Sequence, residues 1–247
     1  LHSDTHSFPT RRSSDLDYFY GELDDEVYPS LEISRGPGSR AALAEASKLL
    51  AAAKYPVIIA GGGVSQGDAM AETKALAEYL QAPVVNSYLH NDSFPADHPL
   101  ATGPIGYCGS KAAMRILSKA DVVLALGCRL GPFGTLPQYD IDYWPKNARI
   151  IQVDANARVL GLSKKVDVAS AADVKDYAAD LLTAVKEAMG KPAEAPVRLA
   201  EIAREKARWA EELESWSSAE TSPMHPRAFL KALSESMPKG SIVSTDI

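Results

Sequence analysis

The sequence has few cysteines, no excess of positive charge and no long apolar run, and each of these features argues against a class of function. Its 247 residues contain two cysteines, Cys108 and Cys128, which show neither metal-ligand spacing nor a disulfide framework. The net charge of -6 at pH 7 argues against a surface for nucleic acid or anionic membranes, but it allows a small anionic substrate. No stretch reaches the length of a transmembrane helix, and no signal peptide is visible. We therefore expect a cytoplasmic protein without nucleic-acid or membrane partners.

The sequence does have a regular alternation of amphipathic and fully apolar segments. Apolar residues at helical spacing predict helices, and short uninterrupted apolar runs predict strands that are buried on both faces. The expected helices are 39–54, 66–80, 110–119 and 173–189, and the expected strands are 55–60, 82–85, 121–126, 149–154 and 166–169. This alternation predicts an α/β fold, a doubly wound (Rossmann-like) parallel sheet of about five or six strands. Residues 86–107 are predicted to be a long irregular loop.

The two ends of the chain differ in character from this alternating part. Residues 1–16 have no helical or strand period and look like the translation of a sequencing adapter, so we expect a non-native leader before a connector, 17–38. The sheet domain is expected over 39–190, followed by a linker with a charged helix over 191–222. Residues 223–247 are then predicted to start a truncated second α/β domain. Its first helix is expected to turn Phe229, Leu230 and Leu233 inward, and its first strand is expected over 241–247.

The first predicted strand ends in three consecutive glycines, Gly61, Gly62 and Gly63. Glycines at such a turn allow the backbone to approach either a ligand or a packed helix closely, and both interpretations stay open. The other strand ends carry Asn86, Arg129 and Asp154, and ligands of open α/β sheets gather at these ends. Arg129 is the cation of this set, so it could meet a phosphate. Its alternative role is a salt bridge.

Several motifs in order resemble the thiamine-diphosphate-dependent enzymes, which are built from a pyrimidine-binding, a central and a diphosphate-binding domain. The stretches that carry this resemblance are Tyr55–Gly63, Asp97–Leu100 with Gly103–Gly106, and Asp121–Arg129. Within that superfamily, three further runs resemble the family of sulfoacetaldehyde acetyltransferases, namely Asn86–Pro95, Leu130–Pro137 and Asp142–Pro145. The last residues, Val243–Ile247, are similar to the first strand of the diphosphate-binding domain. The resemblance implies that 39–190 is a central domain and that 223–247 begins a diphosphate-binding domain.

The resemblance implies that the whole enzyme cleaves sulfoacetaldehyde with phosphate, giving acetyl phosphate and sulfite, in sulfonate (taurine) catabolism. It implies thiamine diphosphate and Mg²⁺ as cofactors and a homodimer or homotetramer. The catalytic glutamate would lie upstream of Asp17 and the metal-binding segment downstream of Ile247, so we expect no catalytic residue, no metal site and no activity in this fragment. Two alternatives stay open. One is an acetolactate-synthase-like carboligase or decarboxylase, and the other is a non-catalytic nucleotide-binding module.

The resemblance also implies roles for individual residues. Asn86, His90, Gly106 and Tyr107 would line the active-site cleft. The three glycines, Arg129 and Asp154 would form a nucleotide or phosphate edge, because related central domains place a carboxylate at the position of Asp154 to accept hydrogen bonds from ribose hydroxyls. A helix cap is the alternative role of Asp154. Flavin-binding relatives carry acidic residues after the arginine, whereas Leu130–Phe133 follows here, and this departure argues against flavin.

Overall fold

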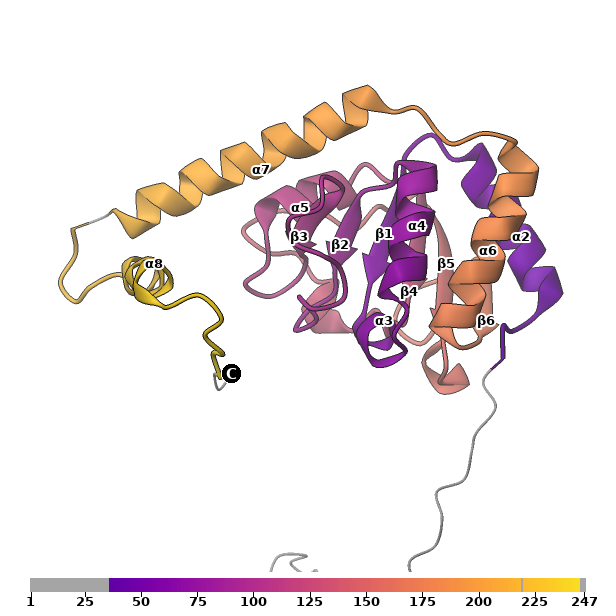
Figure 1. Cartoon of the computed structure of the whole chain (residues 1–247), viewed down its shortest axis with the longest axis horizontal. Helices are drawn as coiled ribbons and strands as arrows, with labels where there is room; N and C mark the ends of the chain where they lie inside the picture. Colours follow the sequence, from indigo (N-terminus) through magenta and orange to yellow (C-terminus); the bar gives the residue numbers. More distant parts are fainter. Residues whose placement is uncertain (1–35, 219, 245–247) are drawn as a thin grey trace, which may run out of the picture. The chain divides into compact units, whose positions relative to one another are not determined.

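Six parallel strands form the centre of the structure, a computed structural model that describes residues 36–218 and 220–244 (Figure 1). The strand order is β3-β2-β1-β4-β5-β6, and every neighbouring pair is parallel. The strands are β1 (Pro56–Ala60), β2 (Val84–Asn86), β3 (Ala101–Pro104), β4 (Val122–Leu126), β5 (Arg149–Asp154) and β6 (Val168–Ala171). The predicted doubly wound α/β sheet is therefore confirmed.

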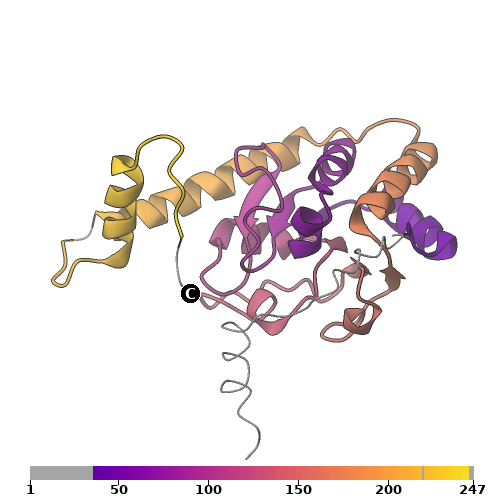
Figure 2. The same cartoon turned by 60° about the horizontal axis from the view of Figure 1, so that its bottom comes forward.

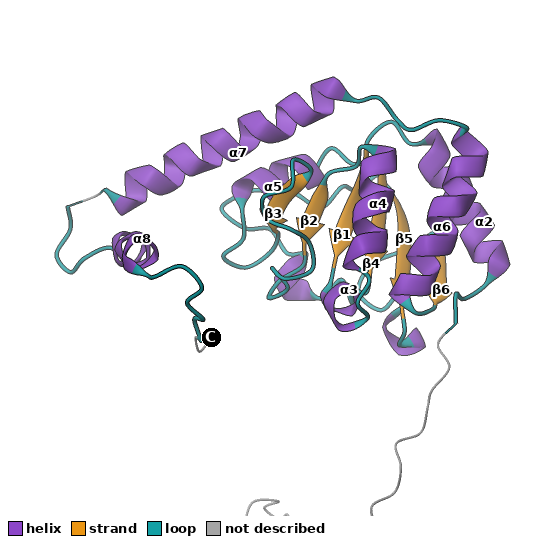
Figure 3. Ribbon diagram, in the orientation of Figure 1, coloured by secondary structure: helices purple, strands orange, loops and turns teal. Residues whose placement is uncertain are grey.

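Helices cover both faces of the sheet. The helices are α2 (Arg40–Ala52), α3 (Gly62–Gln66), α4 (Met70–Leu80), α5 (Lys111–Leu117), α6 (Val174–Met189), α7 (Pro196–Ser217) and α8 (Pro226–Ser236). Helices α2, α4 and α6 pack on one face, where Ile58 and Leu124 point, and Figure 3 shows α4 and α6 lying over that face. Helix α5 and the segment around Tyr143 cover the other face, where Val57 and Val123 point. Since successive residues of a strand face opposite sides, β1 and β4 are buried throughout.

Three helix starts follow from local side-chain chemistry. Ser39 accepts a hydrogen bond from the backbone N–H of Ala42, and Ser110 accepts one from Ala113. Asp173 caps α6 by accepting from the N–H groups of its second and third residues. None of the helices in the described ranges is both long enough and apolar enough to cross a membrane.

The structure corrects three predicted boundaries. The stretch 86–107 is not a continuous loop, because Ala101–Pro104 forms β3 and pairs with β2 across an irregular register. The predicted helix 66–80 begins only at Met70, as α4, and a separate short helix, α3, precedes it over Gly62–Gln66, with Asp68 at a left-handed φ of 52° between them. The last strand lies two residues later than predicted, at Val168–Ala171, where it can pair with the buried part of β5.

The C-terminal segment differs more from its prediction. Helix α8 forms, and His225 caps it by accepting from the Arg227 N–H, but its apolar residues do not point inward. Phe229 and Leu230 are 58% and 54% exposed, because α8 packs on α7 and on no sheet in the described part of the chain. Residues 241–244 are not in a strand, and 245–247 lie outside the described residues. The leader 1–16 and most of the connector 17–38 also lie outside them.

Helix α7 packs along the sheet domain, and the side of the helix that makes this contact carries both charged and apolar residues. Ile202 is 1% exposed and Trp209 is 8% exposed, as predicted for packing residues of this charged helix. At its N-terminal part, the Arg198 guanidinium donates to the carbonyl oxygens of Leu80, Gln81 and Lys54 at distances of 3.2, 2.7 and 2.7 Å. These carbonyls end α4 and follow α2, where carbonyl groups lack helical partners. Arg198 therefore joins three helices.

We expect Arg198→Met to lower the free energy of unfolding by about 2 kcal/mol, because half-buried carbonyl groups lose charged hydrogen-bond donors. Chemical denaturation followed by circular dichroism measures this change. The matched control on the same helix is Arg204→Met, since Arg204 is largely exposed and, within the described ranges, its one polar contact is an ion pair with Glu201 at 3.6 Å. That variant should stay within about 0.5 kcal/mol of the parent. Equal losses in the two variants would contradict the assigned role of Arg198.

Candidate functional site

The carboxyl ends of all six strands lie at one edge of the sheet, because every neighbouring pair is parallel. The strand order reverses between β1 and β4, and this topological switch point is where open α/β sheets usually bind ligands. The turns that meet there are Gly61–Gly63 after β1 and Gly127–Arg129 after β4. We take this edge, together with the loops that leave β2 and β3, as the candidate site.

The turns after β1 and β4 touch through their backbones. A Cβ atom on Gly61 would lie 2.2 Å from the Gly127 oxygen, and one on Gly63 would lie 2.6 Å from the Gly127 Cα. The N–H of Gly61 donates to Leu126, and the N–H of Gly63 donates to Gly127. These contacts favour the tight-packing interpretation for Gly61 and Gly63, because their N–H groups are used within the fold. The ligand-facing role of the three glycines stays a prediction.

Gly62 meets a different neighbour, the imidazole of His90. A Cβ atom on Gly62 would lie 2.5 Å from His90 Cε1, so the ring lies directly against the glycine. The loop that carries His90 is held by Asn86, whose amide Nδ2 donates to the His90 carbonyl at 3.2 Å and to Ser93 Oγ at 3.0 Å. Ser93 Oγ in turn donates to the Ala60 carbonyl at the end of β1. The structure thus brings His90 and Gly62 together, while Asn86 is buried as a support of the loop.

Tyr107 belongs to a largely exposed aromatic cluster, which consists of Tyr88, Tyr107 and Phe133, and the buried Gly106 directly precedes it. The Tyr88 ring stacks on Phe133 with centroids 5.7 Å apart, and Tyr107 meets both rings edge-on at 6.3 and 6.5 Å. Gly106, at φ +87°, leaves room for the Phe133 carbonyl, which accepts from the Tyr107 N–H at 2.8 Å. Sequence reasoning missed Tyr88 and Phe133 as site residues. Tyr88 lies two residues after the end of β2, which was an available signal, whereas Phe133 lies well beyond the end of β4 and no local pattern pointed to it.

Three turns beside this cluster hold non-glycine residues in the left-handed region. These residues are Leu89 at φ 66°, Cys108 at φ 55° and Leu130 at φ 55°, which follow β2, β3 and β4 respectively. A left-handed non-glycine residue costs about 1–2 kcal/mol, and such strain gathers at functional sites. Strain after three of the six strands supports a functional role for this edge of the sheet.

Arg129 and Asp154 lie on the other side of the switch point and differ in their bonding. The Arg129 side chain is exposed and makes no hydrogen bond or ion pair with residues 36–218 or 220–244. The salt bridge considered as its alternative role is therefore not formed within these ranges. Asp154 Oδ1 accepts from the Asn156 N–H at 2.9 Å, which favours a turn-capping role over a free ligand for ribose. Next to Arg129, burial raises the pKa of the Cys128 thiol, and hydrogen bonds with Leu130 and Ser87 oppose this rise. A thiol with a raised pKa is a poor nucleophile.

The described residues do not fit a metal–diphosphate site. No group of three or more His, Cys, Asp or Glu side chains in the described ranges is placed to hold a metal ion. The edge offers an exposed cation, an aromatic cluster and hydrogen-bonded loops, which is a surface for binding or packing.

Comparison with known proteins places this arrangement in a family. The profile described as "Thiamine pyrophosphate enzyme, central domain" matches residues 43–181. A protein of Castellaniella defragrans named sulfoacetaldehyde acetyltransferase is 51% identical over 97% of this chain. A probable acetolactate synthase large subunit of Methanocaldococcus jannaschii is 32% identical over 92% of it. The chain spans 43% and 39% of the length of these two relatives.

A solved structure agrees at the level of the fold. Benzoylformate decarboxylase from Polynucleobacter necessarius superimposes with a TM-score of 0.63 and 21% sequence identity, over 88% of this chain and 38% of that one. The central-domain profile covers more than half of this chain, including β1, β4, β5 and both turns of the switch point. The chain therefore belongs to the thiamine pyrophosphate enzymes, of which it contains the central domain.

Proposed function

We propose that this chain is part of a sulfoacetaldehyde acetyltransferase, which converts sulfoacetaldehyde and phosphate into acetyl phosphate and sulfite. The observation that carries the proposal is the 51% identity over 97% of the chain to a protein of that name, against 32% to a probable acetolactate synthase subunit. Because the match covers almost the whole chain, it includes the loops at the carboxyl edge as well as the buried strands. Sulfonate catabolism is the corresponding proposed pathway.

In this proposal the chain supplies a scaffold and part of the cleft. His90, Gly106 and Tyr107 line the cleft, while Asn86 holds the loop that carries His90. Thiamine diphosphate and Mg²⁺ are held by other parts of the whole protein, since the described residues lack a set of metal ligands. The anionic substrate, a cytoplasmic location and a homodimer or homotetramer are part of the same proposal. The domain boundaries at 39–190, 191–222 and 223–247 remain proposals as well.

The test uses the whole protein that contains this chain, supplied with thiamine diphosphate and Mg²⁺. With sulfoacetaldehyde, we expect equal amounts of acetyl phosphate and sulfite, with release that depends on added phosphate. With pyruvate alone, we expect no acetolactate above background. Acetolactate from pyruvate without acetyl phosphate from sulfoacetaldehyde would refute the proposal and favour the carboligase alternative.

A second measurement addresses the proposed nucleotide or phosphate edge. Thermal unfolding of the chain with and without ADP or coenzyme A reports binding, because a ligand that binds only the folded state raises the melting temperature. We expect Arg129→Met to remove any such shift in melting temperature. Arg158→Met should keep the shift, because Arg158 is an exposed arginine in the segment after β5. An unchanged melting temperature with both compounds would contradict the proposed nucleotide or phosphate edge and indicate that these residues serve only in packing.

A further inference from the structure

Lys111, the first residue of α5, sits among three aromatic rings. Its Nζ lies 5.0 Å from the ring centroid of Tyr139, 5.6 Å from Trp209 and 5.5 Å from Trp216. The same ammonium pairs with the carboxylate of Glu212, and only 16% of the Lys111 side chain is exposed. An ammonium over aromatic faces is attracted by their electron density, and more strongly where water is excluded. We refer to Tyr139, Trp209, Trp216 and Glu212 as the lysine cage.

The cage joins parts of the chain that are far apart in sequence. Lys111 directly follows the loop 105–110, which carries Gly106 and Tyr107. Tyr139 lies in the loop 131–148, which also carries Phe133. The remaining cage residues belong to α7, where Trp209 and Trp216 meet edge-to-face at 5.5 Å. A single ammonium therefore connects the two loops beside the aromatic cluster with the C-terminal half of α7.

The contacts continue from the cage to α8. The guanidinium of Arg227 lies 5.8 Å from the Trp216 ring centroid, so this ring contacts cations of both α5 and α8. Lys231 of α8 pairs with Glu214 of α7 at 2.6 Å. Figure 2 shows α8 beside the C-terminal end of α7. Since α8 buries no residue of its own, these contacts with α7 determine its position.

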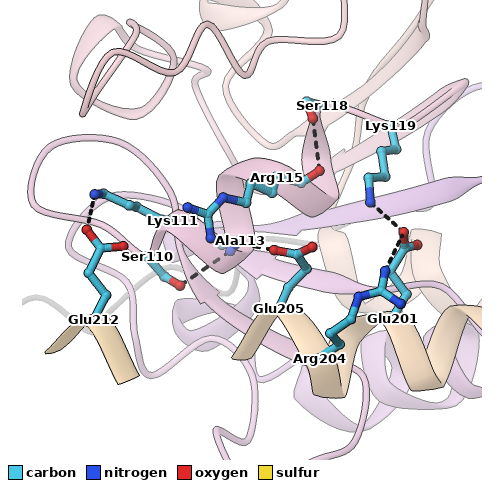
Figure 4. A network of polar contacts seen from close by, with 10 residues as sticks. All are labelled: Ser110, Lys111, Ala113, Arg115, Ser118, Lys119, Glu201, Arg204, Glu205 and Glu212. Atoms are coloured by element: carbon cyan, nitrogen blue, oxygen red, sulfur yellow. Dashed lines mark hydrogen bonds and ion pairs between the residues drawn. The ribbon is translucent and has the colours of Figure 1, made fainter. Parts of the chain in front are cut away.

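Two further basic residues pair with α7, but they do not enter a cage. Arg115 lies 3.5 Å from Glu205, and Lys119 pairs with Glu201 (Figure 4). Segment 111–119 and helix α7 are therefore antiparallel, because later residues of the segment pair with earlier residues of the helix. Of the three basic residues, Lys111 alone lies over aromatic rings within the described ranges. Lys119 is thus a natural control, because it offers the same charge to the same helix without a cage.

We propose that Lys111 is the positioning residue that fixes the C-terminal half of α7, and through Trp216 and Arg227 also α8, against the loops at the carboxyl edge of the sheet. Its ammonium acts through the aromatic rings and not on a substrate. This inference goes beyond the proposed function and does not depend on it. It predicts that removing this one charge releases α8 and the C-terminal half of α7 while leaving the sheet intact.

The test compares Lys111→Met, Lys111→Arg and Lys119→Met in the 247-residue chain. Hydrogen exchange followed by mass spectrometry reports on 209–217 and on α8, and the near-ultraviolet dichroism of the tryptophan pair reports on the cage. A Trp144→Phe background removes the third of the three tryptophans from the optical signal. In Lys111→Met we expect exchange about tenfold faster in both segments, with a weaker tryptophan dichroism, and unchanged exchange in β1 and β4. Lys111→Arg should restore both signals, because a guanidinium also binds over aromatic rings.

Three outcomes would overturn the proposal. The first is unchanged exchange and dichroism in Lys111→Met. The second is an equal effect of Lys119→Met, which would show that any charge pair with α7 does the same. The third is faster exchange in β1 and β4 together with α7, because Lys111 would then support the sheet and not the position of α7.

Discussion

Replacing Gly127 with alanine is expected to lower the free energy of unfolding by about 3 kcal/mol. Gly127 has a φ of +56°, a conformation that costs an alanine about 1–2 kcal/mol. The new Cβ would also lie 2.4 Å from the Cα of Gly63, a backbone atom that cannot rotate away. Hydrogen bonds from the Gly127 N–H to Val153 and from the Gly63 N–H to Gly127 hold both turns in place. Overpacking of this kind typically adds 1–3 kcal/mol.

Urea denaturation of the chain measures this loss, and Gly131→Ala supplies the control in the same segment. Gly131 has a φ of -63°, and nothing lies within 4 Å of the Cβ that alanine would add. That substitution should be neutral or stabilise by about 0.5 kcal/mol, because alanine restricts the unfolded chain. A loss below about 1 kcal/mol in Gly127→Ala would mean that the two turns can separate without unfolding.

The same contact shows what the sequence could not settle about the glycines. Three consecutive glycines after an apolar strand predict a tight turn, and the chain does turn there, passing from β1 through Gly61 directly into α3. Glycine has no side chain that could indicate whether a ligand or another backbone faces it, so both interpretations stayed open. The answer for Gly61 and Gly63 depends on Gly127, which is distant in sequence and becomes a neighbour only when β4 pairs with β1.

Most of the sheet could be predicted because the sequences of most strands by themselves indicate buried strands. β1 and β4 are apolar runs buried on both faces, and their burial follows from their composition. β3 was missed because Ala101–Pro104 contains a glycine and a proline, residues that are depleted in strands. Its strand conformation comes from pairing with β2, and the Val84 N–H donates to the carbonyl of Leu100 just before it. Tertiary pairing therefore overrides local preference there.

For the candidate site, the sequence placed the residues at the strand ends but did not give their contacts. Strand ends of a parallel sheet must converge on one edge, so Asn86, Arg129 and Asp154 were correctly placed there. Their bonding could not be foreseen, because it depends on loop geometry. Asn86 turned out to be a buried support, and Asp154 caps a turn. The Phe133 carbonyl fills the space above Gly106, a contact that no local pattern indicates.

Asn86→Asp is the second substitution for which we expect a large effect, about 3 kcal/mol lost at pH 7. The Asn86 side chain is 5% exposed, and its amide donates to the His90 carbonyl and to Ser93 Oγ. An aspartate of the same shape replaces this donor with a charged acceptor that faces a carbonyl oxygen. A buried charge without compensation costs about 3–5 kcal/mol, and a rotated Ser93 hydroxyl offsets part of that. Urea denaturation at a series of pH values measures the loss.

The pH dependence distinguishes a buried support from a loop residue that merely lines the edge. Burial beside a carbonyl oxygen raises the pKa of the introduced carboxylate above its unfolded value of about 3.9. The deficit relative to the parent is therefore complete above the folded pKa, and it shrinks as the pH falls through that value, because protonation restores a donor. Asn91→Asp, exposed in the same loop, should stay within about 0.5 kcal/mol of the parent at every pH. A pH-independent deficit in Asn86→Asp would show that the carboxylate reaches solvent, and the loop after β2 would then be held by Ser93 alone.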